Sequence, residues 1–204
     1  MLTNLSRRID DLHQHCDIVV IGASAGGIDA LKGLLHDLPP TLAASLLIVM
    51  HIGAGYASQL ASILKPHVAL PIADAVDGQR LERGRIYVAI SDHQLTIEEG
   101  VIHVLSSPKE GHYRPCIDTL FRSAAAAYGP RVVGIVLSGM LKDGTAGLRH
   151  ITYGGGVSVV QDPQEALESS MPVNAIFGDH VQFILPVHKI GQLLVRLAGN
   201  SPVY

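Results

Sequence analysis

Three side chains suited to acyl transfer follow apolar segments of the sequence. Ser24 comes after the run 18–21, His51 comes directly after the run 46–50, and Asp143 comes shortly after the run 132–137. A nucleophilic hydroxyl, an imidazole that accepts its proton and a carboxylate that orients the imidazole are what acyl transfer through serine requires. Their chain order differs from the Ser, Asp, His order of α/β-hydrolases, so the residues indicate a separate solution to the same geometry.

Ser24 lies in a glycine-rich turn, with Gly22 before it and Gly26 and Gly27 after it. A strand–turn–helix of this kind exposes the hydroxyl near a helix N-terminus, where free N–H groups favour developing negative charge. Taken alone, the turn also fits a structural turn with serine as helix cap, or a dinucleotide-binding fingerprint. The fingerprint is disfavoured because serine replaces its middle glycine, and because His51 stands where an acidic ribose ligand is expected.

The three residues can meet only if their segments share one sheet edge. The runs 18–21, 46–50, 132–137 and 157–160 are typical of buried parallel strands, and helical spacing is found over 28–37, 117–128 and 187–197. This alternation predicts an α/β fold: a doubly wound, mostly parallel sheet in a three-layer α/β/α arrangement. Sites in such sheets form at the carboxyl ends of strands, near a switch in strand order. We therefore expect Ser24, His51 and Asp143 at one edge, with Asp143 also capping the helix that follows it.

The remaining segments complete one domain over residues 17–204, preceded by a tail or lead-in helix over 1–16. The stretch Leu95–Leu105 is typical of a β-hairpin with its turn at Glu99 and Gly100, inserted beside the sheet. Shorter elements are expected as a helix over 56–64, a strand over 85–89, a helix over 171–177 and a strand over 181–185.

Composition excludes several classes of protein. The 204 residues are 48% hydrophobic but only 4% aromatic, which predicts an aliphatic core. The net charge is −3 without a basic block, so we expect no nucleic-acid partner, and the longest apolar runs are too short to insert into a membrane. Cys16 and Cys116 form no disulfide framework, the N-terminus lacks a signal peptide, and the histidines lack metal-ligand spacing. A reduced, cytoplasmic protein is expected.

An ordered set of motifs runs through the chain: Gly22-Ala-Ser-Ala-Gly-Gly27, Ile48-Val-Met-His51, Arg114-Pro-Cys-Ile-Asp118 with Leu120-Phe-Arg-Ser-Ala-Ala125, Ser138-Gly-Met-Leu-Lys-Asp-Gly144 and Met171-Pro172. Together these motifs resemble the catalytic domain of CheB-type chemotaxis protein-glutamate methylesterases. The resemblance covers about residues 17–197.

The resemblance implies a role for each candidate residue. Ser24 would be the nucleophile, His51 the general base and Asp143 the residue that orients it, while backbone N–H groups near Ala25 and Met140 would hold the oxyanion. The implied reaction removes methyl groups from glutamate γ-methyl esters on the methylated helices of chemoreceptors, and the same residues could deamidate glutamine. No metal or organic cofactor is implied.

The chain departs from the family pattern in ways that bear on activity and regulation. Leu141 replaces a common glycine, and Ala25 replaces a threonine that commonly follows the nucleophile. Members typically carry an N-terminal phospho-receiver domain, which sixteen residues cannot contain, so control by a separate regulatory protein is expected. The alternative function is a catalytically weak module that docks on receptors or signalling partners. Cys116 is expected to be a packed thiol, and Tyr113 to rim the cleft without a chemical role.

Overall fold

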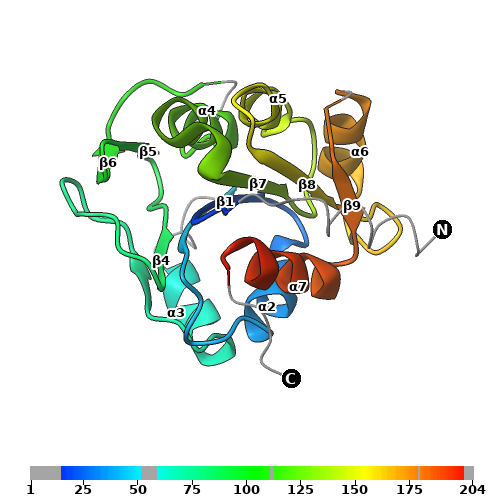
Figure 1. Ribbon diagram of the computed structural model, residues 1–204. Helices are drawn as coiled ribbons and strands as arrows, with labels where there is room; N and C mark the ends of the chain where they lie inside the picture. Colours follow the sequence, from blue (N-terminus) through cyan, green and yellow to red (C-terminus); the bar gives the residue numbers. More distant parts are fainter. Residues whose placement is uncertain (1–14, 52–58, 111–112, 179, 200–204) are drawn as a thin grey trace.

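A parallel seven-stranded sheet forms the centre of the molecule (Figure 1). The computed structural model describes residues 15–51, 59–110, 113–178 and 180–199. The strand order is β3-β4-β2-β1-β7-β8-β9, and each neighbouring pair is parallel. The strands are β1 (Ile18–Ala23), β2 (Ser45–Met50), β3 (Ile72–Asp74), β4 (Arg85–Val88), β7 (Val132–Val136), β8 (Val157–Gln161) and β9 (Phe183–Leu185).

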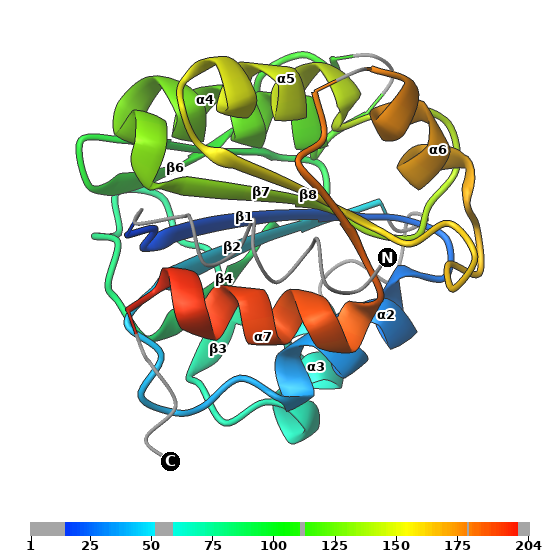
Figure 2. The same ribbon diagram turned by 45° about the vertical axis from the view of Figure 1, so that its right-hand side comes forward.

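Helices cover both faces of this sheet, so the predicted three-layer α/β/α fold is confirmed (Figures 1 and 2). One face carries α2 (Gly27–His36), α3 (Leu60–Leu64) and α7 (Val187–Leu197); the other carries α4 (Ile117–Tyr128), α5 (Thr145–Tyr153) and α6 (Ser170–Phe177). Two short 3₁₀ turns lie at Lys65–His67 and Gly129–Arg131. Alternate β1 residues enter two separate cores, Val19 and Ile21 on the α2 side and Val20 on the α4 side. A strand buried on both faces is expected to be apolar throughout.

The predicted hairpin is also confirmed. Strands β5 (Gln94–Glu98) and β6 (Val101–Leu105) pair antiparallel in a two-stranded sheet that packs beside α4. Glu99 and Gly100 form its turn with φ values of 48° and 81°. Such positive φ values at both central residues match the right-handed twist of a two-residue hairpin.

Some expected elements differ in the structure. Strand β3 was not predicted because its three residues lie at the sheet edge without a buried apolar run. The last strand begins at Phe183 rather than 181. Of the helix expected over 56–64, the structure shows α3 from Leu60, while 52–58 lie outside the described residues, as do 1–14 of the expected tail. Among the described residues, no helix is long and apolar enough to cross a membrane.

The strand order creates a switch point at β1. From β1 the chain proceeds outward through β2 to the β3–β4 edge, and then returns to pair β7 on the other side of β1. At such a point the loops leaving the carboxyl ends of neighbouring strands diverge and leave a crevice. The loops after β1, β2 and β7 carry Ser24, His51 and Asp143 respectively.

A buried carboxylate holds the opposite end of the sheet. Asp17, directly before β1, has a side chain only 1% exposed and accepts hydrogen bonds from Arg83 and Arg131. Arg83 lies two residues before β4 and Arg131 lies directly before β7, so the carboxylate ties together the starts of three strands. Burial by itself raises the pKa of Asp17, but the hydrogen bonds and charges of Arg131 and Arg83 outweigh it and lower that pKa below its ordinary value.

Replacing Asp17 by asparagine is expected to lower the free energy of unfolding by about 1–3 kcal/mol at about pH 7, the cost of losing charged hydrogen bonds. Because the folded pKa is lowered, this contribution is fully present above the unfolded value of about 4 and is lost as the pH falls through the folded value. Urea denaturation of wild type and Asp17→Asn across that range measures the difference.

The matched control is Asp29→Asn, which removes a carboxylate 86% exposed and paired with Lys32 at 3.8 Å. We expect it to change the free energy of unfolding by less than about 0.5 kcal/mol, because exposed pairs contribute little. Equal effects of the two substitutions would contradict a special role for Asp17.

Candidate active site

Ser24 occupies the turn between β1 and α2, as the sequence predicts. Its N–H donates to Ser138 O at 2.9 Å, and its carbonyl accepts from Gly27 N at 2.8 Å. The N-cap of α2 is Gly26, with φ 73° and no side-chain cap. The interpretation of Ser24 as a helix cap is therefore wrong, and its half-buried hydroxyl makes no hydrogen bond to the described residues.

Two glycines allow the surrounding loops to approach Ser24. A Cβ atom on Gly26 would lie 2.7 Å from both Leu167 Cβ and Ser138 Oγ, and the positive φ independently favours glycine there. A Cβ atom on Gly139 would lie 2.8 Å from Ser24 Cβ. The loop after β7 consequently passes directly against the serine.

His51 lies beside Ser24 because of strand register. Ala23 of β1 is paired with Met50 of β2, so the next residues of the two parallel strands are Ser24 and His51. The N–H of His51 donates to Ala23 O at 3.0 Å, which continues the ladder. The backbone therefore sets Ser24 and His51 next to each other.

The imidazole of His51 pairs with the carboxylate of Asp143. Nε2 lies 2.8 Å from Oδ2, and the two side chains are 11% and 3% exposed. With Nε2–H donating to Asp143, Nδ1 is the nitrogen left to accept a proton. The ring is thus turned relative to chymotrypsin-type triads, in which Nδ1 faces the carboxylate.

Asp143 also accepts several hydrogen bonds from around α4. Its carboxylate accepts from the N–H groups of Ile117 at 2.7 Å, Asp118 at 3.0 Å and Gly144 at 2.9 Å. It therefore occupies the N-terminus of α4. The expectation that it caps the following helix is wrong, since α5 has Gly144 as N-cap, with φ 93° and no side-chain cap.

These donors keep Asp143 ionised. Burial by itself raises its pKa, but hydrogen bonds from His51, Ile117 N and Asp118 N outweigh burial and lower the pKa below its ordinary value. Cys116 Sγ donates to Asp143 Oδ1 at 3.3 Å, and burial together with the charge of Asp143 raises the pKa of that thiol to about 12. Cys116 is 2% exposed, so the prediction of a packed thiol is confirmed.

Two backbone N–H groups near Ser24 have no hydrogen-bond partner among the described residues. Within the part of the chain that the structure describes, the N–H groups of Ala25 and Met140 donate to no other group. Ala25 directly follows Ser24, and Met140 directly follows Gly139, which packs against Ser24. Free N–H groups beside a serine are the arrangement that stabilises an oxyanion.

Tyr113 is a site residue to which the sequence analysis gave no role. Its ring stacks on the His51 imidazole, with centroids 4.0 Å apart and an interplanar angle of 0°. The pKa of its hydroxyl is raised by burial first and by the charge of Asp143 second, so the phenol stays neutral. A tyrosine in a polar loop carries no periodic signal, and only its closeness to 116–118 along the chain links it to Asp143.

The loop between Met140 and Asp143 is fastened to α6. Leu141 has φ 68°, is 60% exposed, donates its N–H to Ser170 Oγ at 3.2 Å and accepts from Asn174 Nδ2 at 2.7 Å. Left-handed backbone costs a non-glycine residue about 1–2 kcal/mol. The hydrogen bonds from α6 hold Leu141 in this strained conformation.

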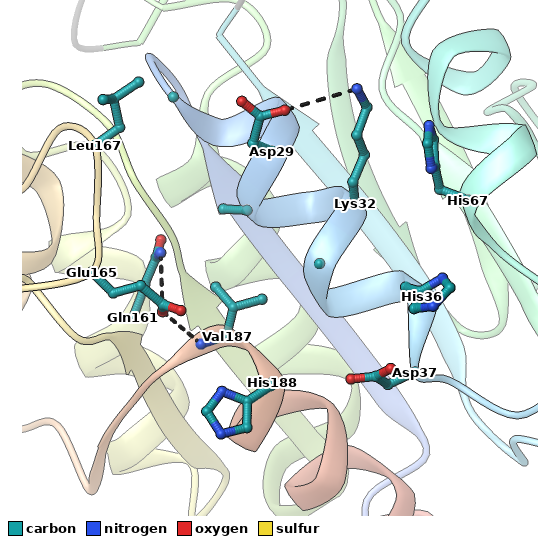
Figure 3. A pocket seen from close by; sticks show the side chains of 13 residues that line it. Asp29, Lys32, His36, Asp37, His67, Gln161, Glu165, Leu167, Val187 and His188 are labelled. Carbon is teal, nitrogen blue, oxygen red and sulfur yellow. Dashed lines mark hydrogen bonds and ion pairs between the residues drawn. The ribbon is translucent and has the colours of Figure 1, made fainter.

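A separate open groove of about 670 Å³ lies between α2 and α7 (Figure 3). Two of its carboxylates are engaged locally: Asp29 pairs with Lys32, and Glu165 accepts from the N–H of Val187 at the start of α7. The groove reaches Gly26 but is not lined by Ser24, His51 or Asp143. Across the described residues, no cluster of His, Cys, Asp or Glu is arranged to hold a metal ion.

Comparison with known proteins places this geometry in context. Residues 19–194 match the family model of the CheB methylesterase. A relative from Leptospira interrogans is 36% identical over 186 residues, which cover 91% of this chain and 96% of that protein. The protein-glutamate methylesterase/protein-glutamine glutaminase of Ralstonia nicotianae is 35% identical over 91% of this chain, but the match covers 50% of its own length. The crystal structure of the Thermotoga maritima CheB methylesterase catalytic domain superposes with a TM-score of 0.85 at 30% identity, covering 89% of this chain and 98% of that one.

Replacing Leu141 by glycine is expected to raise the free energy of unfolding by about 0.5–1 kcal/mol, because relief of left-handed strain exceeds the extra chain entropy of glycine. Thermal or urea denaturation measures the gain. The control Leu141→Ala removes most of the exposed side chain but keeps the strain, so it should give no gain. An equal rise with alanine would show that the side chain, and not the backbone, is responsible.

Proposed function

The chain belongs to the CheB methylesterase family and is a hydrolase of the protein-glutamate methylesterase/protein-glutamine glutaminase kind, and on that premise we propose that Ser24, His51 and Asp143 are its catalytic residues. The observation that carries this proposal is the His51–Asp143 pair, held at 2.8 Å, with His51 directly after β2 and Ser24 directly after the neighbouring strand β1. We assign this catalytic domain to residues 17–204.

The reaction begins at the ester carbonyl of a glutamate γ-methyl ester. Ser24 Oγ attacks the carbonyl carbon while Nδ1 of His51 takes the hydroxyl proton. The N–H groups of Ala25 and Met140 stabilise the oxyanion of the tetrahedral intermediate. His51 then returns the proton to the methoxy group. Methanol leaves, and an acyl-enzyme remains on Ser24.

The second half of the reaction uses the same residues with water. His51 takes a proton from water as its oxygen attacks the acyl carbon, and then returns a proton to Ser24 Oγ as the free carboxylate departs. Asp143, kept charged by its donors, stabilises the imidazolium in both halves. With a glutamine side chain the same steps release ammonia in place of methanol.

The proposed substrate is the methylated helix of a chemoreceptor. This proposal follows from membership of the CheB family. The rim offers apolar contacts for such a helix: Met140 is 54% exposed and Leu167, which packs against Gly26, is 77% exposed. We further propose a cytoplasmic location. The two described cysteines, free and buried, fit a reducing compartment.

Ser24→Ala is expected to reduce methanol release from methylated receptor fragments by about 10⁴–10⁶-fold, the cost of removing a serine nucleophile. Radiolabelled or enzyme-coupled detection of methanol measures the initial rate. Ser106→Ala, which alters an exposed serine in the loop after β6, is the matched control and should leave the rate unchanged.

The outcomes separate the candidate functions. Equal methanol release by wild type and Ser24→Ala would overturn the serine mechanism. Absence of release by wild type, together with retained binding of the receptor fragment, would instead favour the catalytically weak docking module.

A further inference from the structure

The ring of Tyr113 covers one face of the His51 imidazole in parallel contact, with centroids 4.0 Å apart. A histidine ring turns about its χ2 bond, and a turn out of this plane would drive a ring edge into the tyrosine. Asp143 fixes the ring at Nε2 only, through a single hydrogen bond of 2.8 Å. A second, independent restraint on the plane of the ring is therefore provided by the stacked face.

Tyr113 is itself held rigidly by its backbone. Its N–H donates to Glu110 O at 2.9 Å and its carbonyl accepts from Glu110 N at 3.1 Å. The buried side chain of Gln94 fastens the same segment twice, since Nε2 donates to Tyr113 O at 3.2 Å and Oε1 accepts from Cys116 N at 2.8 Å. The segment 113–118 thus both positions Tyr113 over His51 and carries groups that donate hydrogen bonds to Asp143.

The phenol hydroxyl takes no part in these contacts. Within the described ranges, no hydrogen bond joins the hydroxyl to any residue. The contact that Tyr113 makes with His51 is made by the ring. The flat π face is consequently the feature that bears on His51. An aromatic face also stabilises a positive charge held over it, and the imidazole becomes positive each time it takes a proton.

We infer that Tyr113 is a positioning residue that holds the His51 imidazole in the plane from which Nδ1 meets Ser24, and that stabilises the imidazolium through its ring face. This inference rests on the proposed triad. The positioning role requires an aromatic ring at residue 113 and does not require the tyrosine hydroxyl.

The test compares Tyr113→Phe with Tyr113→Leu and Tyr113→Met in the full chain, using methanol release from methylated receptor fragments. The phenylalanine variant should stay within about threefold of wild type. The leucine and methionine variants should lose about 10- to 100-fold in kcat with KM unchanged, because a misaligned base affects the chemical step rather than binding. The acid limb of their kcat/KM profiles should move to lower pH, since the protonated ring loses a stabilising face.

Further measurements separate positioning from a merely structural role. Thermal denaturation should place all three variants within a few degrees of wild type. A loss of kcat by Tyr113→Phe of about 10-fold or more would overturn the inference by assigning the effect to the hydroxyl, and this result is obtained from the phenylalanine variant alone. Wild-type kcat and pH profile in both Tyr113→Leu and Tyr113→Met would overturn it as well.

Ser24→Ala in the same assay distinguishes this inference from the proposed function. Wild-type release by Ser24→Ala would overturn the triad and the role of Tyr113 with it. An inactive Ser24→Ala beside fully active leucine and methionine variants would overturn the role of Tyr113 alone.

Discussion

The buried carboxylate of Asp143 is the group on which the arrangement of this site depends. It lies where the loop after β7, the start of α4 and the end of β2 converge, and it takes donors from all three. A carboxylate that is 3% exposed is costly unless its oxygens are satisfied. The first N–H groups of α4, which have no partner inside the helix, supply that satisfaction together with the helix dipole. One charge thus fixes a helix, a loop and a histidine relative to each other.

The sheet between its two ends is almost entirely aliphatic, and contacts of this kind are non-directional. Directional bonds are concentrated instead at the two ends. Asp17 joins the starts of β1, β4 and β7 through two arginines, whereas Asp143 joins the loops at their carboxyl ends. Both carboxylates have lowered pKa values despite burial, because each is given several charged or backbone donors. The apolar core supplies burial, and the two carboxylates supply specific geometry.

The buried strands and the shared sheet edge could be predicted because continuous apolar runs and the residues that follow them are local features of the sequence. For that reason the sequence alone predicts Ser24, His51 and Asp143 at one edge of the sheet. The helix that Asp143 caps could not be predicted, because its partner α4 is distant in sequence and meets it only through tertiary packing. Tyr113 was given no role for a similar reason, since its stacking on His51 depends on how Gln94 fastens the loop.

The turned imidazole explains why restraint must come from more than one direction. With Nε2 used by Asp143, Nδ1 is the nitrogen left to act as the proposed base. Nδ1 neighbours Cγ, the ring carbon bonded to Cβ, so its position depends closely on the backbone of His51. The N–H of His51 donates a hydrogen bond to the carbonyl of Ala23, the residue before Ser24. His51 and Ser24 are therefore held by the same hydrogen-bond ladder between β1 and β2. Rotation of the ring is the freedom that remains. Asp143 limits it at the ring edge and Tyr113 at the ring face, so two restraints from different directions together define one orientation.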